Sequence, residues 1–298
     1  MASNVTTAKE TNVIEKSKIA KVRELDFATM FGENINSLIT MLGVTRKIPV
    51  TAGTVLKKLT VTGTLNDTSV GEGEIIPLSL YQTTWTTVGE ITLNKFRKAT
   101  TAEAILKGGF DQAVNETDKK MVLDIQKQVR AGLVASLDDD NATEVSGDKL
   151  QAVLAKAWGQ LQVKFEDDAI QAVYFINPLD IADYLETAQI TVQTAFGFSY
   201  VENFLGLGTV IMSPQITKGE VYATASQNIV AYYIDVNESN GLGDAFEFTT
   251  DPETGMVGIH EDSNYQRLQS ETVAISGVTF FAEMPAGIIK GTIETESE

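Results

Sequence analysis

The residues best suited to chemistry lie in the run Ile259–His260–Glu261–Asp262, which contains the only histidine of the chain. An imidazole beside two carboxylates could act as a general base or contribute to a metal site. Adjacent side chains of a strand point to opposite faces, however, and a metal site needs several ligands at suitable spacing. With no second histidine and no cysteine, the run predicts a lone histidine at the surface or in a turn.

Two other patterns resemble ligand-binding loops only in part. The run Asp138–Asp139–Asp140–Asn141 lacks the alternation, central glycine and distal glutamate of a calcium loop, which favours a solvated helix end. Gly206–Leu207–Gly208 lacks the third glycine of a phosphate loop. No Gly-x-Ser-x-Gly elbow and no phosphate-loop lysine motif occurs. We therefore expect no enzyme, no catalytic or metal-binding residue and no cofactor.

Charge and composition narrow the class of protein further. The chain of 298 residues is 43% hydrophobic, enough for a sizeable core, and its formal net charge is -17. Such a surface argues against a broad basic face that grips nucleic acid. No apolar run approaches the length of a membrane span, and the first residues are polar. We expect neither a membrane anchor nor a secretion signal.

The first part of the chain is locally basic in an otherwise acidic protein. Residues before Glu24 are mostly polar and read as an arm instead of a packed element. The basic residues that could make contacts from this arm are Lys16, Lys18, Lys21 and Arg23. A mobile, solvated tail is the alternative interpretation.

Hydrophobic periodicity predicts a mixture of helices and strands. A short amphipathic helix should run from Asp26 to about Leu42, and a long one should follow the stripe from Val114 to Leu137. β-branched and aromatic residues predict strands between Thr51 and Thr101. Further predictions are a helix at 150–161, a buried strand at 172–176, a helix from Pro178, and strands at 209–212, 220–224, 228–234, 256–259, 268–276, 278–283 and 287–294. The sum is an α+β fold.

The segment from Gly63 to Gly89 is long for a hairpin. Gly71–Glu72–Gly73–Glu74 and Pro77 would interrupt a compact sheet, and Tyr81 and Trp85 have no obvious local core. A long hairpin of this kind needs a neighbouring surface on which to rest. The candidate contact residues are Ile76, Tyr81 and Trp85. Packing within the parent sheet remains the alternative, because aromatic residues serve cores and interfaces alike.

Four segments, taken in order, resemble the major capsid proteins of tailed bacteriophages, which have the Hong Kong 97-type fold. They are the hairpin tip Val70–Gly71–Glu72–Gly73–Glu74–Ile75–Ile76–Pro77, the strand and turn Ala172–Val173–Tyr174–Phe175–Ile176–Asn177–Pro178, the turn and strand Gly206–Leu207–Gly208–Thr209–Val210–Ile211–Met212–Ser213 with Lys218–Gly219, and the closing run Pro285–Ala286–Gly287–Ile288–Ile289–Lys290–Gly291–Thr292–Ile293. Each is weak alone. Their order spans about nine tenths of the chain.

The resemblance implies a division of the chain into five parts. Residues 1–45 would form an N-terminal arm and short helix, and residues 46–103 an extended E-loop hairpin with flanking strands. Residues 104–147 would form the spine helix of a P-domain, and residues 148–248 an A-domain. Residues 249–298 would return to the P-domain strands and end in an acidic tail.

The resemblance also implies a function and partners. Pentamers and hexamers of the chain would close an icosahedral shell around double-stranded DNA, without sequence-specific binding, in the cytoplasm of a bacterial host. A separate scaffolding protein, a portal and decoration proteins would be partners, and the basic arm would touch scaffold or DNA. No lysine lies between Lys58 and Lys95, so the lysine cross-link of some relatives is not expected. The alternatives are a bacterial nanocompartment shell of the same fold and a phage tail or decoration protein.

Overall fold

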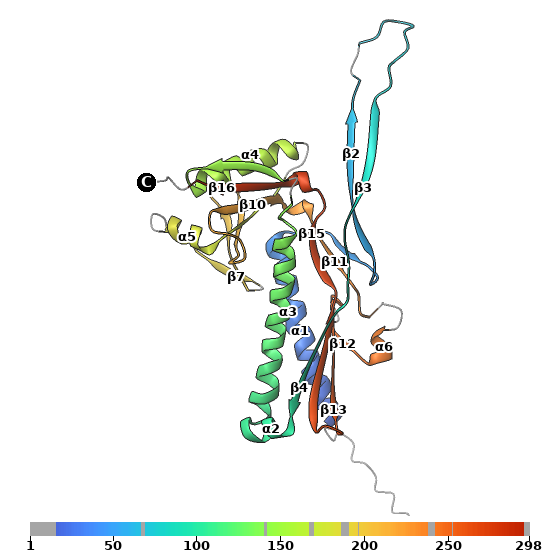
Figure 1. Ribbon diagram of the computed structural model, residues 1–298, viewed down its shortest axis with the longest axis vertical. Coiled ribbons are helices and arrows are strands. Elements are labelled where there is room, and N and C mark those ends of the chain that lie inside the picture. The colour runs from blue at the N-terminus through green and yellow to red at the C-terminus, as the bar shows by residue number, and fades with distance from the viewer. Residues whose placement is uncertain are drawn as a thin grey trace, which may run out of the picture.

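The computed structural model describes residues 16–66, 69–139, 142–166, 170–185, 191–195, 197–237, 242–251 and 253–294. Most of the expected arm, before residue 16, and most of the expected acidic tail, after residue 294, lie outside this range. Figure 1 shows an elongated molecule with a mixed lobe beside one end of two long helices, and a hairpin that projects beyond them. The chain combines helices with mostly antiparallel strand pairs, which is the α+β organisation that the sequence predicts.

The mixed lobe is built on a seven-stranded sheet. Its strands, in spatial order, are β5 (Thr143–Gly147), β16 (Ile288–Ile293), β10 (Glu220–Ala225), β6 (Ala172–Ile176), β9 (Gly208–Met212), β8 (Phe198–Phe204) and β7 (Gln193–Ala195). Helix α4 (Leu150–Lys164) covers one face of this sheet, and α5 (Pro178–Leu185) follows β6. The central strand β6 is buried at every position, because its two faces belong to two different cores.

The turn after β6 shows how the sequence ends one element and starts the next. Pro178 begins α5, where its missing N–H would have had no helical partner. The side chain of Asn177 caps this start: its Oδ1 accepts from the Leu179 amide at 2.9 Å, and its Nδ2 donates to the Ile216 carbonyl at 2.6 Å. The predicted strand and helix at this point are both confirmed.

Helix α1 (Lys16–Leu42) is longer than the sequence predicts. Its C-terminal end agrees, because Leu42 is the last residue and Gly43 follows in the left-handed region at φ 64°. Its first turns carry no apolar stripe, which is why periodicity placed the start near Asp26. Phe31 and Leu38 of the stripe are fully buried in the main core, and ahead of the stripe Arg23 and Glu24 hold the helix through polar contacts to distant segments of the chain.

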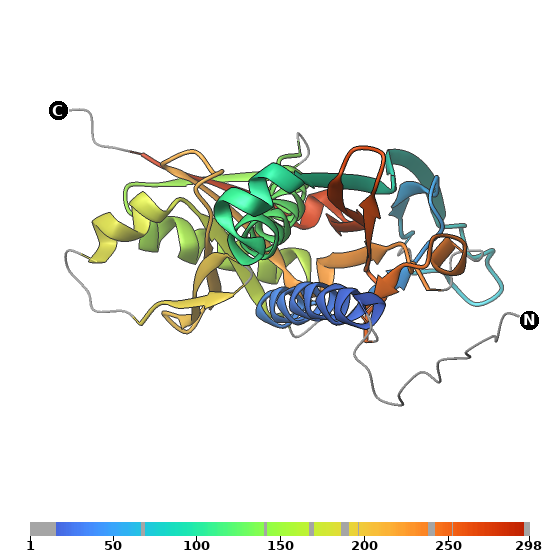
Figure 2. The ribbon, with the colours of Figure 1, turned by 90° about the horizontal axis from the view of Figure 1, so that it is seen from below.

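The predicted long helix is present but begins in three steps. Helix α2 (Ala102–Gly108) ends at Gly109, whose φ of 79° breaks the helix, and a π-helical turn, η1 (Asp111–Asn115), leads into α3 (Glu116–Ala135). Helices α1 and α3 run alongside each other in both views (Figures 1 and 2). The π turn was not predicted, because the apolar stripe that predicts the long helix starts only at Val114, inside η1.

Two smaller sheets continue from the lobe along these helices. One contains β12 (Thr249–Thr250), β13 (Val257–Asn264), β14 (Gln269–Ser276) and β4 (Asn94–Thr101), and the other contains β1 (Lys47–Pro49), β11 (Ile229–Tyr233) and β15 (Val278–Ala282). The last strand, β16, returns to the seven-stranded sheet, where Ile288 and Ile289 are buried on opposite faces. The predicted division of the chain at residue 249 therefore does not coincide with a division between sheets, because β16 belongs to the sheet of the lobe. Short elements complete the fold: η2 (Ser226–Asn228), α6 (Leu242–Phe246) and η3 (Pro285–Gly287).

The projecting hairpin is a two-stranded sheet of its own. Strands β2 (Val55–Thr64) and β3 (Leu80–Glu90) pair antiparallel and have no third strand among the described residues. Its base is anchored by Leu56 and Ile91, which are buried with Ile234 in a small core. Beyond this base the described side chains of the hairpin are mostly exposed, as the sequence predicts for a segment without packing partners in its own domain.

Candidate subunit interface and buried charge network

The two faces of the projecting hairpin have different chemistry. Gly63 lies opposite Tyr81 and Val61 opposite Thr83, and side chains alternate along a strand, so Val61, Tyr81 and Trp85 share one face. They are exposed by 57%, 60% and 63%. The opposite face carries mainly exposed hydroxyl and amide side chains, Thr62, Thr64, Gln82, Thr84 and Thr86, and one exposed leucine, Leu80, which pairs with Thr64 at the outer end of the strands. We call the face with Val61, Tyr81 and Trp85 the apolar face of the hairpin.

A glycine shapes this apolar face. A Cβ atom added at Gly63 would come within 2.0 Å of the Tyr81 ring, so the ring lies flat over the glycine backbone. An aromatic ring that covers a cross-strand glycine is a recurrent way to stabilise a strand pair. The result is an ordered aromatic surface that stays open to solvent.

The loop that joins the two strands extends this open apolar surface. Ile76 is exposed by 73%, and its neighbours Ile75 and Leu78 are more exposed still. The Glu74 carboxylate accepts a hydrogen bond from the Gly71 amide at 2.9 Å, which closes the acidic turn in front of them. All three predicted contact residues, Ile76, Tyr81 and Trp85, are therefore at the surface, and none is packed in its parent domain.

The four basic candidates of the N-terminal segment divide into two groups. Lys16, Lys18 and Lys21 lie in the first turns of α1. Arg23 is instead held inside the chain: its guanidinium pairs with Asp118 of α3 at 3.1 Å and with Glu261 of β13. Because its side chain is only 20% exposed, the structure gives Arg23 a role within the subunit.

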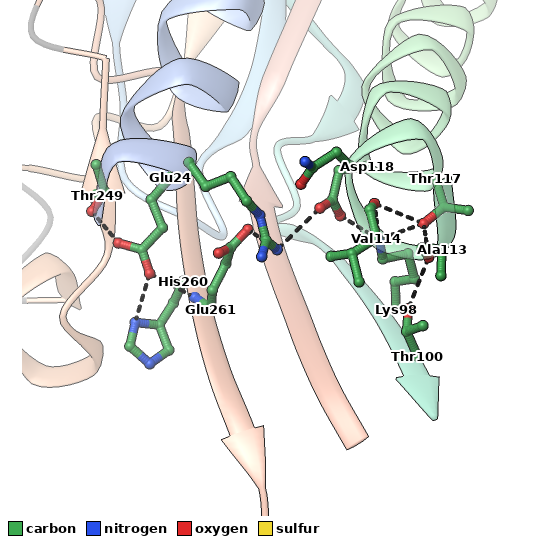
Figure 3. A network of polar contacts seen from close by, with 12 residues as sticks. Glu24, Lys98, Thr100, Ala113, Val114, Thr117, Asp118, Thr249, His260 and Glu261 are labelled. Atoms are coloured by element: carbon green, nitrogen blue, oxygen red, sulfur yellow. Dashed lines mark hydrogen bonds and ion pairs between the residues drawn. The ribbon is translucent and has the colours of Figure 1, made fainter. Parts of the chain in front are cut away.

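Arg23 belongs to a network of polar side chains between α1, α3 and the strands β4, β12 and β13. Figure 3 shows its labelled members, among them Glu24, Asp118 and Glu261. On one side of Arg23, Glu24 is 4% exposed and its carboxylate accepts hydrogen bonds from the Thr249 hydroxyl at 2.6 Å and the Glu261 amide at 2.7 Å. His260 Nδ1 lies 3.7 Å from the same carboxylate. These contacts attach the first described side chains of α1 to β12 and β13.

On the other side of Arg23, the network stabilises the start of α3. Lys98 of β4 pairs with Asp118 and donates to the Val114 carbonyl at 2.9 Å and to the Thr117 hydroxyl at 2.7 Å. Val114 lies in the π turn η1, which alters the regular hydrogen-bond ladder of the helix. A cation from a neighbouring strand thus contacts the carbonyl of an irregular turn, which is how the sheet fixes the start of the helix.

The charges of this network do not balance. It contains three carboxylates, Glu24, Asp118 and Glu261, and two basic side chains, Arg23 and Lys98, together with His260. Glu261 is the member most affected: burial raises the pKa of its carboxyl to about 7, against the opposing effect of Arg23. We call these six residues the charge network.

The structure places the remaining sequence motifs as follows. His260 is partly exposed on β13 and lies beside Glu24, a contact that the sequence did not predict. Asp138 pairs with Lys290 and accepts from the Tyr222 hydroxyl at 3.1 Å, while residues 140 and 141 lie outside the described range. Gly206 and Gly208 form the turn between β8 and β9 at φ 75° and 149°. Within the described residues, no group of three or more His, Cys, Asp and Glu side chains is placed to hold a metal ion.

One signal in the sequence could have revealed the network. Glu24 lies four residues before Ala28 and seven before Phe31, both fully buried, so it continues the buried stripe of α1. A charged residue at a buried helical position requires a partner, and the partners come from segments distant in sequence.

Among the described residues, no helix combines the length and apolar character needed to cross a bilayer.

Comparison with known proteins identifies the fold of this chain. No protein-family model matches the sequence, and no curated protein matches it. Three solved structures resemble the chain along most of its length. The capsid of the cyanophage P-SCSP1u has a TM-score of 0.55 at 7% identity, over 84% of this chain and 86% of that one. The capsid of the empty GTA particle has a TM-score of 0.54 at 8% identity, over 99% and 96%. The holo-SrpI encapsulin complex of Synechococcus elongatus has a TM-score of 0.51 at 8% identity, over 98% and 95%. The chain therefore has the Hong Kong 97-type fold, which phage capsids and encapsulins share.

Proposed function

We propose that this chain is the major capsid protein of a tailed bacteriophage. In this proposal pentamers and hexamers of the chain close an icosahedral shell around double-stranded DNA, in the cytoplasm of the bacterial host. The observation that carries the proposal is the apolar face of the hairpin, because its aromatic side chains lie in the open on a segment supported only at its base. The shared fold with capsid structures supports the same conclusion.

The apolar face supplies a driving force for association. Burial of a large apolar side chain stabilises by about 1.5–3 kcal/mol, and Val61, Tyr81 and Trp85 offer three such side chains on one surface. A two-stranded hairpin is marginally stable alone in water, so contact with a second copy would order the hairpin and join the subunits at once. Assembly then proceeds without a cofactor.

The parts of the fold can be assigned to this task. The β2–β3 hairpin would be the E-loop, α3 with the four-stranded sheet the P-domain, and the seven-stranded lobe the A-domain that faces the capsomer centre. Lys16, Lys18 and Lys21 would touch a scaffolding protein or DNA. A portal and decoration proteins would complete the virion. A net charge of -17 suits a shell whose wall does not hold packaged DNA through firm phosphate contacts.

A bacterial nanocompartment shell is the second candidate. The observation in its favour is the fold shared with the SrpI encapsulin complex over 98% of this chain. The two candidates share the fold of the shell protein and differ in what the shell encloses. Particles purified from the native source should contain double-stranded DNA if the chain is a capsid protein. A protein cargo and no DNA would replace the first proposal with the second.

Electron microscopy tests the shared part of both proposals. The purified chain should form closed spherical particles under negative stain. Open tubes would instead indicate a tail component, the remaining alternative, and would contradict the shell proposal.

A further inference from the structure

The charge network has the composition of a proton-binding site. With its three carboxylates ionised and His260 neutral, two basic side chains leave a net charge of -1 in a partly buried place. A buried uncompensated charge is costly, and the usual response is the uptake of a proton. Addition of one proton brings the network to neutrality.

The geometry indicates which group accepts that proton. Glu261 has a side chain only 5% exposed, and within the described residues its Oε2 has no hydrogen-bond partner. The Glu24 carboxylate, by contrast, accepts hydrogen bonds from the Thr249 hydroxyl and the Glu261 amide. Asp118 contacts both basic side chains, Arg23 and Lys98. Glu261 therefore keeps one buried oxygen, Oε2, available to bind a proton.

The groups around Glu261 come from every element packed against it. Helix α1 supplies Arg23 and Glu24, α3 supplies Asp118, and β4 supplies Lys98. On β13 itself, His260 lies beside Glu24, and Asp262 points away from the buried face. The residue opposite on β14, Thr272, carries no charge. Burial, Asp118 and Glu24 favour protonation of Glu261, whereas Arg23 opposes it.

We propose that Glu261 takes up one proton from solvent as the pH falls through neutrality, and that this proton clamps the first turns of α1 against β13 and α3. The proton binds to a carboxylate oxygen, and no other bond forms or breaks. Once Glu261 is neutral, the charges of Arg23 and Lys98 balance those of Glu24 and Asp118, and the Glu261 carboxyl can still accept a hydrogen bond from Arg23. The clamp acts on α1 because Arg23 and Glu24 join this end of the helix to α3, β12 and β13.

The direction of the pH dependence follows from the shift. The pKa of Glu261 is raised to about 7 in the folded chain, so the folded state binds the proton more tightly than the unfolded state does. The stabilisation is full at acidic pH and is lost as the pH rises through about 7. At alkaline pH the start of α1 should therefore open more often.

The clamp would control how a basic segment is presented. Lys16, Lys18 and Lys21 precede Arg23 on the same helix, so a loosened α1 would free them from the body of the subunit. This consequence rests on the proposed function, in which those lysines touch scaffold or DNA. The clamp itself does not depend on it, because it can be measured on a subunit that never assembles.

Hydrogen–deuterium exchange of the full chain at pH 5.5, 7.0 and 8.5 tests the clamp. Protection factors, which correct for intrinsic exchange, should fall at least fivefold from pH 5.5 to 8.5 in residues 16–30. Helix α4 lies far from the network and serves as the internal reference. If residues 16–30 follow α4 at every pH, the proposal is overturned, and this comparison needs no variant.

Three substitutions sharpen the test. Glu261→Gln mimics the neutral acid, so protection of residues 16–30 should stay high at all three pH values. Glu144→Gln makes the same change at an exposed position of β5 and should behave as the unsubstituted chain. His260→Gln should keep the pH dependence. Its loss in His260→Gln, or its persistence in Glu261→Gln, would contradict the assignment to Glu261.

Discussion

The charge network and the projecting hairpin differ in where their side chains find partners. In the network, charged side chains from α1, α3, β4 and β13 find partners within one chain, although their residues are up to 238 positions apart, from Arg23 to Glu261. In the hairpin, apolar side chains close to one another in sequence find no cover on their own chain. Polar residues are inside and apolar residues outside, the reverse of the usual arrangement. Each reversal marks a place where function or regulation can reside.

The comparison predicts that damage to the hairpin should affect assembly, and damage to the network should affect stability. Among substitutions in the hairpin, Trp85→Ala should have the largest effect on assembly. Truncation of a central aromatic contact costs about 2 kcal/mol or more, so closed shells should fall about 30-fold at a given concentration. The free energy of unfolding of the unassembled chain should change by less than about 0.5 kcal/mol, since Trp85 is exposed.

Particle counts in electron micrographs and urea unfolding measure these two quantities. Thr84→Ala, on the opposite face of the same strand, is the matched control and should leave both unchanged. A normal particle yield from Trp85→Ala would remove the hairpin from the interface.

On the network side, Arg23→Ala should give the largest loss of stability. Removal of the guanidinium leaves Asp118 and Glu261 without their shared cation in a place that excludes most water. We expect a loss of about 3 kcal/mol in the free energy of unfolding. Arg97→Ala is the control, because the Arg97–Glu271 pair lies at the surface with Arg97 56% exposed, and solvent screening should make its loss far less costly than that of Arg23. Equal effects of the two variants would show that burial does not set the strength of the network.

Lys98→Met tests the part of the network that contacts η1 and α3, and leaves the part that contacts α1 in place. Methionine keeps the length of the side chain but removes the pair with Asp118 and the hydrogen bonds to Val114 and Thr117. We expect a loss of about 2 kcal/mol in urea unfolding. Hydrogen exchange should show the loosening in η1 and the start of α3 before it reaches α4. A uniform loss of protection along the chain would contradict a local role for Lys98.

The smallest expected effect concerns the basic segment. If Lys16, Lys18 and Lys21 contact DNA, the association should weaken with salt, and the slope of log K against log salt should fall by about 2–3 when all three become glutamine. Binding titrations at low and high salt measure this slope. An association that salt leaves unchanged would count against a phosphate contact.

The sequence predicted the parts of the fold that depend on local patterns. The fully buried strand at β6, the helix that starts at Pro178 and the exposed hairpin follow from apolar runs, proline and glycine, which act within a few residues. Ile76, Tyr81 and Trp85 could be chosen as surface candidates because no local partner for them was visible. Which face of the hairpin carries the aromatics required the strand register.

The parts that could not be predicted depend on contacts between distant segments. The start of α1 at Lys16 lies outside the apolar stripe, so periodicity alone missed its first turns. Arg23 was expected to reach outward as part of a basic arm, whereas Asp118 and Glu261 hold it inside the subunit. The return of β16 to the seven-stranded sheet is a matter of topology, which short patterns do not encode.

Negative-stain electron microscopy of the purified chain, over a range of concentrations, tests the central claim most directly. Closed spheres are the expected result, because the exposed apolar face of the hairpin would be covered by a neighbouring copy of the chain. A compact monomer at every concentration, with the hairpin folded against its own subunit, would contradict it.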